Sequence, residues 1–118
     1  MDSKEAIFAF SQSEKAKAAL IMASQMIEIY NGLPEHEKHC AERFIRAFLG
    51  MITSEIQLAR KLTSPGLWEP VDKSLNSAFV MMNSGVLGEA AYHIAQAISG
   101  VTTIGQRSMQ CLLDRKLI

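Results

Sequence analysis

The side chains with the clearest chemical potential in this chain are its histidines, cysteines and a few carboxylates. Several are potential metal ligands that helix packing would bring toward one end: His36, His39, Cys40, Glu89 and His93. However, His36 and His39 share a helical face with Arg43, which predicts that they point into water. A buried di-iron site in a helical bundle needs inward Glu-x-x-His pairs, and the sequence has none. We therefore predict no metal site and no cofactor.

His93 has the most specific catalytic interpretation. Histidine phosphotransfer domains are helical bundles of similar size with one exposed His, usually followed by Lys three residues later and Gly four residues later. This chain has Gln96 and Ala97 at those two positions. A neutral imidazole at a water-facing edge can accept a phosphoryl group, but Glu89 lies one turn before His93 and would repel a phosphate. Phosphotransfer through His93, with Gln96 beside it, is therefore an alternative hypothesis.

Glu55 departs from the apolar pattern around it. Its helical neighbours are all apolar: Met51, Ile52, Leu58 and Ala59. An unpaired buried carboxylate is costly, so we predict that Glu55 and Ser108 are buried polar groups joined by a hydrogen bond, or that Glu55 meets a basic partner from another chain. Alternatively, Glu55 lies at a seam of the bundle and extends into water. A further alternative is a small-ligand cavity near Glu55, lined by Phe48, Met51 and Ile52.

Motifs of the common enzyme classes do not occur in the sequence. There is no GxSxG, HExxH, P-loop or GxGxxG sequence, and helical spacing assembles no catalytic triad. The chain has two isolated cysteines, Cys40 and Cys111, without CxxC spacing. This cysteine usage is typical of a protein in a reducing compartment. In an up-down bundle they would lie about 25–30 Å apart at a rise of about 1.5 Å per residue, too far for a disulfide. We therefore predict a chain that is not an enzyme and has no internal disulfide.

These side chains must be positioned by helices, because apolar residues recur at helical spacing and no strand-like alternation persists. Breaks at Asn31-Gly32, at Ser64-Pro65-Gly66 and at Asn83-Ser84-Gly85 separate the helical segments. We expect helices over about residues 13–30, 34–62, 70–83 and 88–114, with Ser11 and Glu14 as a capping box for the first.

Four amphipathic helices with short connections favour an all-α fold, an antiparallel up-down four-helix bundle with a short N-terminal apolar extension. The bundle is predicted to form one domain over residues 1–118, with residues 1–10 as the extension. A competing arrangement joins the last two helices through Gly85 and Gly88 and buries the long helix in an intertwined dimer.

The composition excludes several classes of protein. Of 118 residues, 48% are hydrophobic and 20% are charged, with 12 Lys and Arg against 12 Asp and Glu. This balance is unlike a disordered chain or a basic nucleic-acid binder. No apolar run approaches the roughly 18 residues of a membrane span, and the first residues lack the order of a signal peptide. We expect a cytoplasmic domain that binds neither nucleic acid nor membranes.

Some large apolar residues lie outside the predicted inward faces, and together they form our predicted partner-binding set: Ile7, Phe8, Phe10, Leu67, Trp68, Val80 and Met81. Gathered into one patch, they would mark a contact site. Trp68 either closes one end of the bundle or anchors a partner. Small residues of the last helix, including Gly100 and Gly105, permit close packing within the chain or in a symmetric dimer.

These features favour a non-enzymatic protein–protein interaction module, adaptor-like or chaperone-like, that forms a homodimer. Small bacterial secretion and flagellar chaperones share this size and architecture, which supports the hypothesis by analogy of fold alone.

Overall fold

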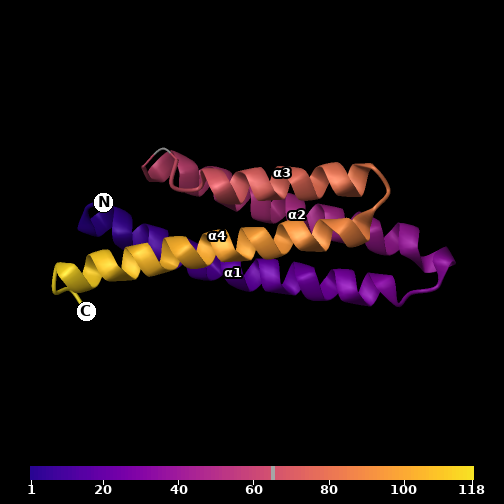
Figure 1. Ribbon diagram of the computed structural model, residues 1–118, viewed down its shortest axis with the longest axis horizontal. Coiled ribbons are helices and arrows are strands. Elements are labelled where there is room, and N and C mark those ends of the chain that lie inside the picture. The colour runs from indigo at the N-terminus through magenta and orange to yellow at the C-terminus, as the bar shows by residue number, and fades with distance from the viewer. Residues whose placement is uncertain (65) are drawn as a thin grey trace.

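The computed structural model describes residues 1–64 and 66–118, and in them the chain forms a bundle of four helices (Figure 1). The helices are α1 (Ser3–Asn31), α2 (Glu35–Leu62), α3 (Glu69–Asn83) and α4 (Leu87–Asp114). Successive helices run antiparallel, and the bundle measures 54 × 23 × 18 Å. The predicted all-α four-helix bundle is thereby confirmed. Since α3 ends at Asn83 and a turn with Gly85 at φ +79° precedes α4, the competing arrangement with one long helix is wrong.

The buried residues of each helix recur every three or four positions. In α1 they are Ala6, Ala9, Ser13, Ala16, Leu20, Ala23 and Ile27. In α2 they are Ile45, Leu49, Ile52, Ile56 and Ala59. In α3 they are Val71, Leu75, Ala78 and Met82. This heptad spacing favours knobs-into-holes packing, in which each side chain enters a gap between residues of a neighbouring helix. We call these buried rows the inner stripes.

Helices α1 and α4 make the most extensive contact in the molecule, because small residues line the buried rows of both helices. In α4 these small residues are Ala90, Ala97, Gly105 and Ser108. A Cβ atom added at Gly105 would lie 3.0 Å from Ser13 Oγ, so these two backbones approach closely. At the far end of the pair, the Met1 carbonyl accepts a hydrogen bond from Arg115 at 3.1 Å. The small residues of α4 therefore serve packing within the chain, and Gly100 does the same against Val71 of α3.

The first ten residues do not form an extension, which corrects the prediction from sequence. Helix α1 begins at Ser3, and the carboxylate of Asp2 caps it by accepting the backbone N–H of Glu5 at 2.7 Å. Ser11 and Glu14 therefore lie inside the helix and do not cap its start. The physical reason is that Ala6 and Ala9, small residues that pack closely on α4, continue the inner stripe to the N-terminus.

Helices α2 and α3 share the least extensive contact of the neighbouring pairs, and a polar cluster joins them where α2 ends and α3 begins. Asp72 of α3 accepts hydrogen bonds from Arg60 at 2.9 Å and from Gln57 at 2.6 Å. Nearby, Glu5 of α1 accepts the hydroxyl and the backbone N–H of Ser64, both at 2.6 Å. These two hydrogen bonds stabilise the charged carboxylate and lower the pKa of Glu5 below its ordinary value, with the Ser64 hydroxyl making the larger contribution. Within residues 1–64 and 66–118, no helix is both long and apolar enough to span a bilayer.

Candidate functional site

A second row of mostly apolar residues runs along α2 beside its inner stripe. Its first five members each lie one position before a residue of the inner stripe, and Leu62 continues the spacing to the end of the helix: Phe44, Phe48, Met51, Glu55, Leu58 and Leu62. We call this row the outer stripe of α2. Most of its apolar members are exposed, with 69% of Phe44 and 66% of Met51 accessible to solvent, whereas Phe48 is half-buried against the core. One helix thus carries two parallel apolar stripes, and the chain covers the inner one.

Helix α1 carries a matching row on the side that faces α2. In this outer stripe of α1, the residues from Phe8 to Met26 each lie one position before a residue of the inner stripe, and Ile29 continues the spacing: Phe8, Gln12, Lys15, Ala19, Met22, Met26 and Ile29. Met22 and Ile29 are exposed, whereas Phe8, Ala19 and Met26 are partly buried against the core. Two antiparallel helices in contact, α1 and α2, therefore carry apolar stripes that adjoin along their shared side.

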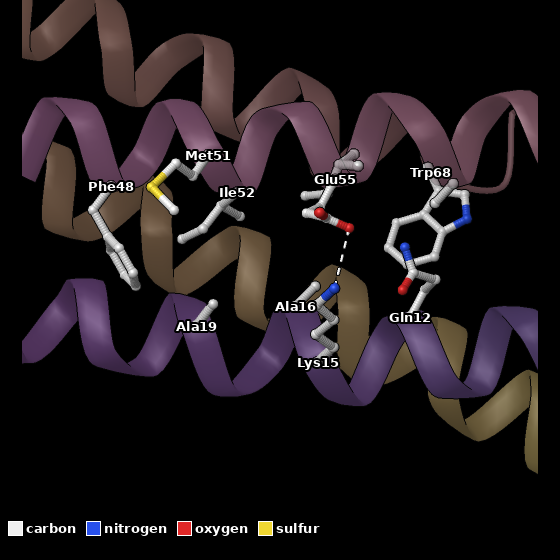
Figure 2. A pocket seen from close by; sticks show the side chains of 11 residues that line it. Gln12, Lys15, Ala16, Ala19, Phe48, Met51, Ile52, Glu55 and Trp68 are labelled. Atoms are coloured by element: carbon white, nitrogen blue, oxygen red, sulfur yellow. Dashed lines mark hydrogen bonds and ion pairs between the residues drawn. The ribbon is translucent and has the colours of Figure 1, made fainter.

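The two outer stripes flank a pocket of about 200 Å³ between α1 and α2, which Figure 2 shows from close by. The pocket and its rims are formed by Gln12, Lys15, Ala16, Ala19, Phe48, Met51, Ile52, Glu55, Ile56, Ala59 and Trp68. Inner-stripe residues such as Ile52 and Ile56 are buried beneath it. We call this pocket, with the two outer stripes beside it, the α1/α2 groove. Phe48, Met51 and Ile52 do line a pocket near Glu55, as the cavity hypothesis from sequence proposed.

Glu55 lies at the rim of the groove and not in the core, so the prediction that it is buried is wrong, and the alternative, a seam position that extends into water, is the one the structure shows. Its carboxylate pairs with Lys15 of α1 at 3.3 Å, and the side chains are 65% exposed for Lys15 and 46% for Glu55 (Figure 2). A pair this exposed is worth about 0–1 kcal/mol. The predicted hydrogen bond to Ser108 is wrong, because α2 packs on α1 and α3, whereas Ser108 lies on α4. Ser108 is buried, and its hydroxyl donates to the Ile104 carbonyl at 2.7 Å.

The residues predicted to bind a partner do not gather into one patch. Trp68 and Leu67 are 1% and 8% exposed, so they belong to the core and are not surface anchors. Trp68 closes the groove at one end beside Gln12, and its indole N–H has no acceptor among the described residues (Figure 2). Ile7 and Val80 are exposed, but they lie near opposite ends of the bundle, at the start of α1 and toward the end of α3.

The rest of that predicted set is half-buried on separate elements. Phe8 and Met81 pack against the core from α1 and α3, and Phe10 faces a shallow depression between α1 and α4. The partner-binding set predicted from sequence did not include Phe44, Met51 or Leu62, although all three are exposed. The sequence does show that the apolar face of α2 is wide. Because contact with one neighbouring helix covers only a single stripe, this width indicates that part of the face stays exposed.

His93 is half-buried on α4, at the edge of a shallow depression against α3. The depression is lined by Pro70, Lys73, Ser74, Ser77, His93 and Gln96. Helix α3 thus brings a lysine and two hydroxyls to the histidine, from a part of the chain distant in sequence. Gln96, named from sequence beside His93, lines the same depression and donates a hydrogen bond to the Tyr92 hydroxyl at 3.1 Å.

The other potential ligands remain apart. Among residues 1–64 and 66–118, no three His, Cys, Asp or Glu side chains are placed to share a metal ion. Cys40 lies near the start of α2 and Cys111 near the end of α4, at opposite ends of the bundle, and both are free thiols. Cys111 donates a hydrogen bond through Sγ to the Met1 carbonyl at 3.2 Å.

The α1/α2 groove is the part of the described surface where apolar exposure, a pocket and an ion pair coincide. Comparison with known proteins found no matching family, no matching curated protein and no matching solved structure. The interpretation of the groove therefore depends on the chain's own residues and their geometry.

Proposed function

We propose that this chain is a non-enzymatic protein–protein interaction module, and that it binds a protein surface through the α1/α2 groove. The observation that carries the proposal is the outer stripe of α2, in which four large apolar residues are exposed along one row, with half-buried Phe48 and the paired Glu55 between them: Phe44, Met51, Leu58 and Leu62. Contiguous exposed apolar surface of this kind marks interaction sites in soluble proteins. Free thiols at Cys40 and Cys111 favour a reducing compartment, and we place the module in the cytoplasm.

The shape of the groove favours a helical partner over a small ligand. Side chains spaced three and four residues apart form the knobs and holes that receive another helix. The pocket has a volume of about 200 Å³, whereas pockets for drug-sized ligands measure about 300–1,000 Å³. It also lies beneath an exposed ion pair, Lys15–Glu55. The small-ligand hypothesis is thus the weaker one, and a protein that covers the groove would bury the outer stripes with it.

A photo-crosslinking residue placed at Met51 tests this function in the cell that makes the protein. Met51 is 66% exposed on the groove, and Val80, 56% exposed on α3, provides a matched control position. We expect ultraviolet light to produce a discrete covalent adduct from position 51 and none from position 80, because a bound protein surface would lie within reach of the groove alone. Adducts at both positions or at neither would contradict the proposed function.

A second candidate function, phosphoryl acceptance by His93, is favoured by one observation. Lys73 of α3 lines the same depression as His93. It can supply the cation that binds a phosphate, in place of the lysine that α4 lacks three residues after His93. With acetyl phosphate as donor, the imidazole nitrogen would attack phosphorus, an N–P bond would form, and acetate would leave with the P–O bond electrons. This function predicts an acid-labile label on the wild type, a reduced label on Lys73→Ala and none on His93→Gln. An unlabelled wild-type chain would end this candidate.

A further inference from the structure

We propose that the α1/α2 groove is occupied by the same face of a second copy of this chain, with Lys15 of each copy opposite Glu55 of the other. This inference names the partner of the proposed interaction site and therefore rests on the proposed function. The two copies would be related by a two-fold axis that lies above the surface of the groove, midway between α1 and α2 and parallel to both helices. Such an axis places α1 of one copy over α2 of its partner.

The geometry of the face suits this symmetry. Rotation about an axis parallel to the helices keeps every residue at its level along the bundle. A residue in the outer stripe of α1 therefore faces α2 of the partner at a fixed level. This is the same level of α2 that the residue adjoins within its own chain. The Lys15–Glu55 contact fixes these levels. Toward the C-terminus of α1, the antiparallel register places Ala19 beside Met51 and Met22 beside Phe48. Toward the N-terminus of α1, it places Gln12 beside Leu58 and Phe8 beside Leu62. Except where Gln12 meets Leu58, apolar levels on both sides of the ion pair would meet apolar levels.

The charges of the face are self-complementary in the same arrangement. Within the two outer stripes, the charged residues are one lysine and one glutamate, Lys15 and Glu55, so the stripes carry no net charge. The two-fold axis brings Lys15 of each copy over Glu55 of the other and makes two reciprocal contacts between unlike charges. A face with one sign of charge would repel its own copy, whereas this face does not.

The size of the face matches what a stable dimer needs. Helix α2 has 28 residues and α1 has 29, which gives a length of about 42 Å at about 1.5 Å per residue. Two helices packed about 8–10 Å apart make a face about 20 Å wide. The resulting area of about 800 Å² per copy equals the contribution of each partner to a standard-size interface.

Sedimentation of the full-length chain tests the dimer and its location. We expect the wild type to sediment at twice its mass of 13.0 kDa. Met51→Lys would place two lysines in the apolar contact, so we expect the dissociation constant to rise at least about tenfold. Val80→Lys, which adds the same charge at an exposed position on α3, would leave the mass unchanged. A wild type that stays single up to about 100 µM, or a Met51→Lys chain that dimerises as the wild type does, overturns the inference.

Charge complementation between two variants tests the reciprocal contact. Lys15→Glu leaves two carboxylates on the face and Glu55→Lys leaves two ammonium groups, so each variant alone should dimerise less well than the wild type. Mixed together, they should form a heterodimer, because the unlike faces attract. An effect confined to the contact within one chain would not be restored by mixing. Mixed variants that remain single chains would show that Lys15 and Glu55 do not meet across the interface.

Lys17→Glu is the matched control for this experiment. Lys17 lies two residues from Lys15 but lines the depression between α1 and α4, away from the groove. Its reversal should neither weaken the dimer nor favour association with Glu55→Lys. Failure of this inference is distinguishable from failure of the proposed function. A single wild-type chain that still gives a Met51 adduct with a different protein in the cell would refute the second copy and retain the interaction site.

Discussion

Two glycines inside helices have opposite surroundings, although the sequence presents them alike. Gly100 lies where α4 crosses α3, and a Cβ atom added there would stand 2.8 Å from Val71 Cγ2. Gly50 of α2 would place a Cβ in open space, with no neighbouring atom within 4 Å. Gly100 is therefore required by a close approach of two helices, whereas Gly50 leaves α2 with the ordinary entropic cost of glycine in a helix.

Alanine substitutions should therefore change stability in opposite directions at these two residues. Gly100→Ala forces Val71 or the helix itself to move, so we expect the free energy of unfolding to fall by about 1–3 kcal/mol. Gly50→Ala adds helix propensity without a clash and should raise it by up to about 1 kcal/mol. Urea unfolding followed by circular dichroism measures both values, with equal slopes as the sign of an unchanged mechanism. Shifts of the same sign would refute the packing described at Gly100.

At this scale the sequence identified Glu55 as unusual but gave the wrong environment for it. Its apolar neighbours along α2 belong to two different stripes, one buried and one exposed. A single sequence shows that the arc is wide, yet it does not show which half the neighbouring helices cover. Ser108 carried the same ambiguity and proved buried, because a serine satisfies its hydroxyl with its own helix through Ile104.

At the scale of elements, the breaks in the chain placed most helix boundaries closely. The expected segments 34–62 and 88–114 correspond to Glu35–Leu62 and Leu87–Asp114. Proline and glycine punctuate those ends, and their effect on the backbone is local, so it can be predicted from sequence. The start of α1 was missed by about ten residues, since its first turns are marked by alanines and an Asp2 cap. Alanine carries little hydrophobic signal even where it is buried.

The packing of α2 was the element-scale feature that sequence did not provide. Small residues draw α1 and α4 together along the length of both helices, whereas α2 approaches α1 less extensively and α3 least of all. These preferences depend on which stripes meet in three dimensions. The periodicity of each helix therefore predicts that it has an apolar face to bury. Which helices pack together decides how much of that face is covered, and in this chain the outer stripe of α2 remains uncovered.

At the scale of the whole molecule, the bundle is a close α1–α4 pair with α3 packed against α4 and α2 packed mainly along α1. This asymmetry leaves the α1/α2 groove on one face, whereas small residues bring α4 close to α1 at Gly105 and close to α3 at Gly100. The candidate site is thus a consequence of how the helices share their apolar surface. The sequence predicted the bundle and an excess of apolar residues, but it did not predict the face on which they gather.

Methionine oxidation in intact cells tests the covered groove most directly, because the chain carries its own control. Met22 and Met51 lie on the outer stripes, whereas Met109 lines the depression between α1 and α4. We predict that hydroxyl radicals oxidise Met22 and Met51 several-fold more slowly in the cell than in the dilute purified chain, since burial in a contact shields the thioether. Because the radical dose differs between cell and buffer, each rate is divided by the rate at Met109, which serves as the internal reference. Ratios for Met22 and Met51 that are the same in the cell and in the purified chain would contradict the account, because the groove would then be open to solvent in the cell.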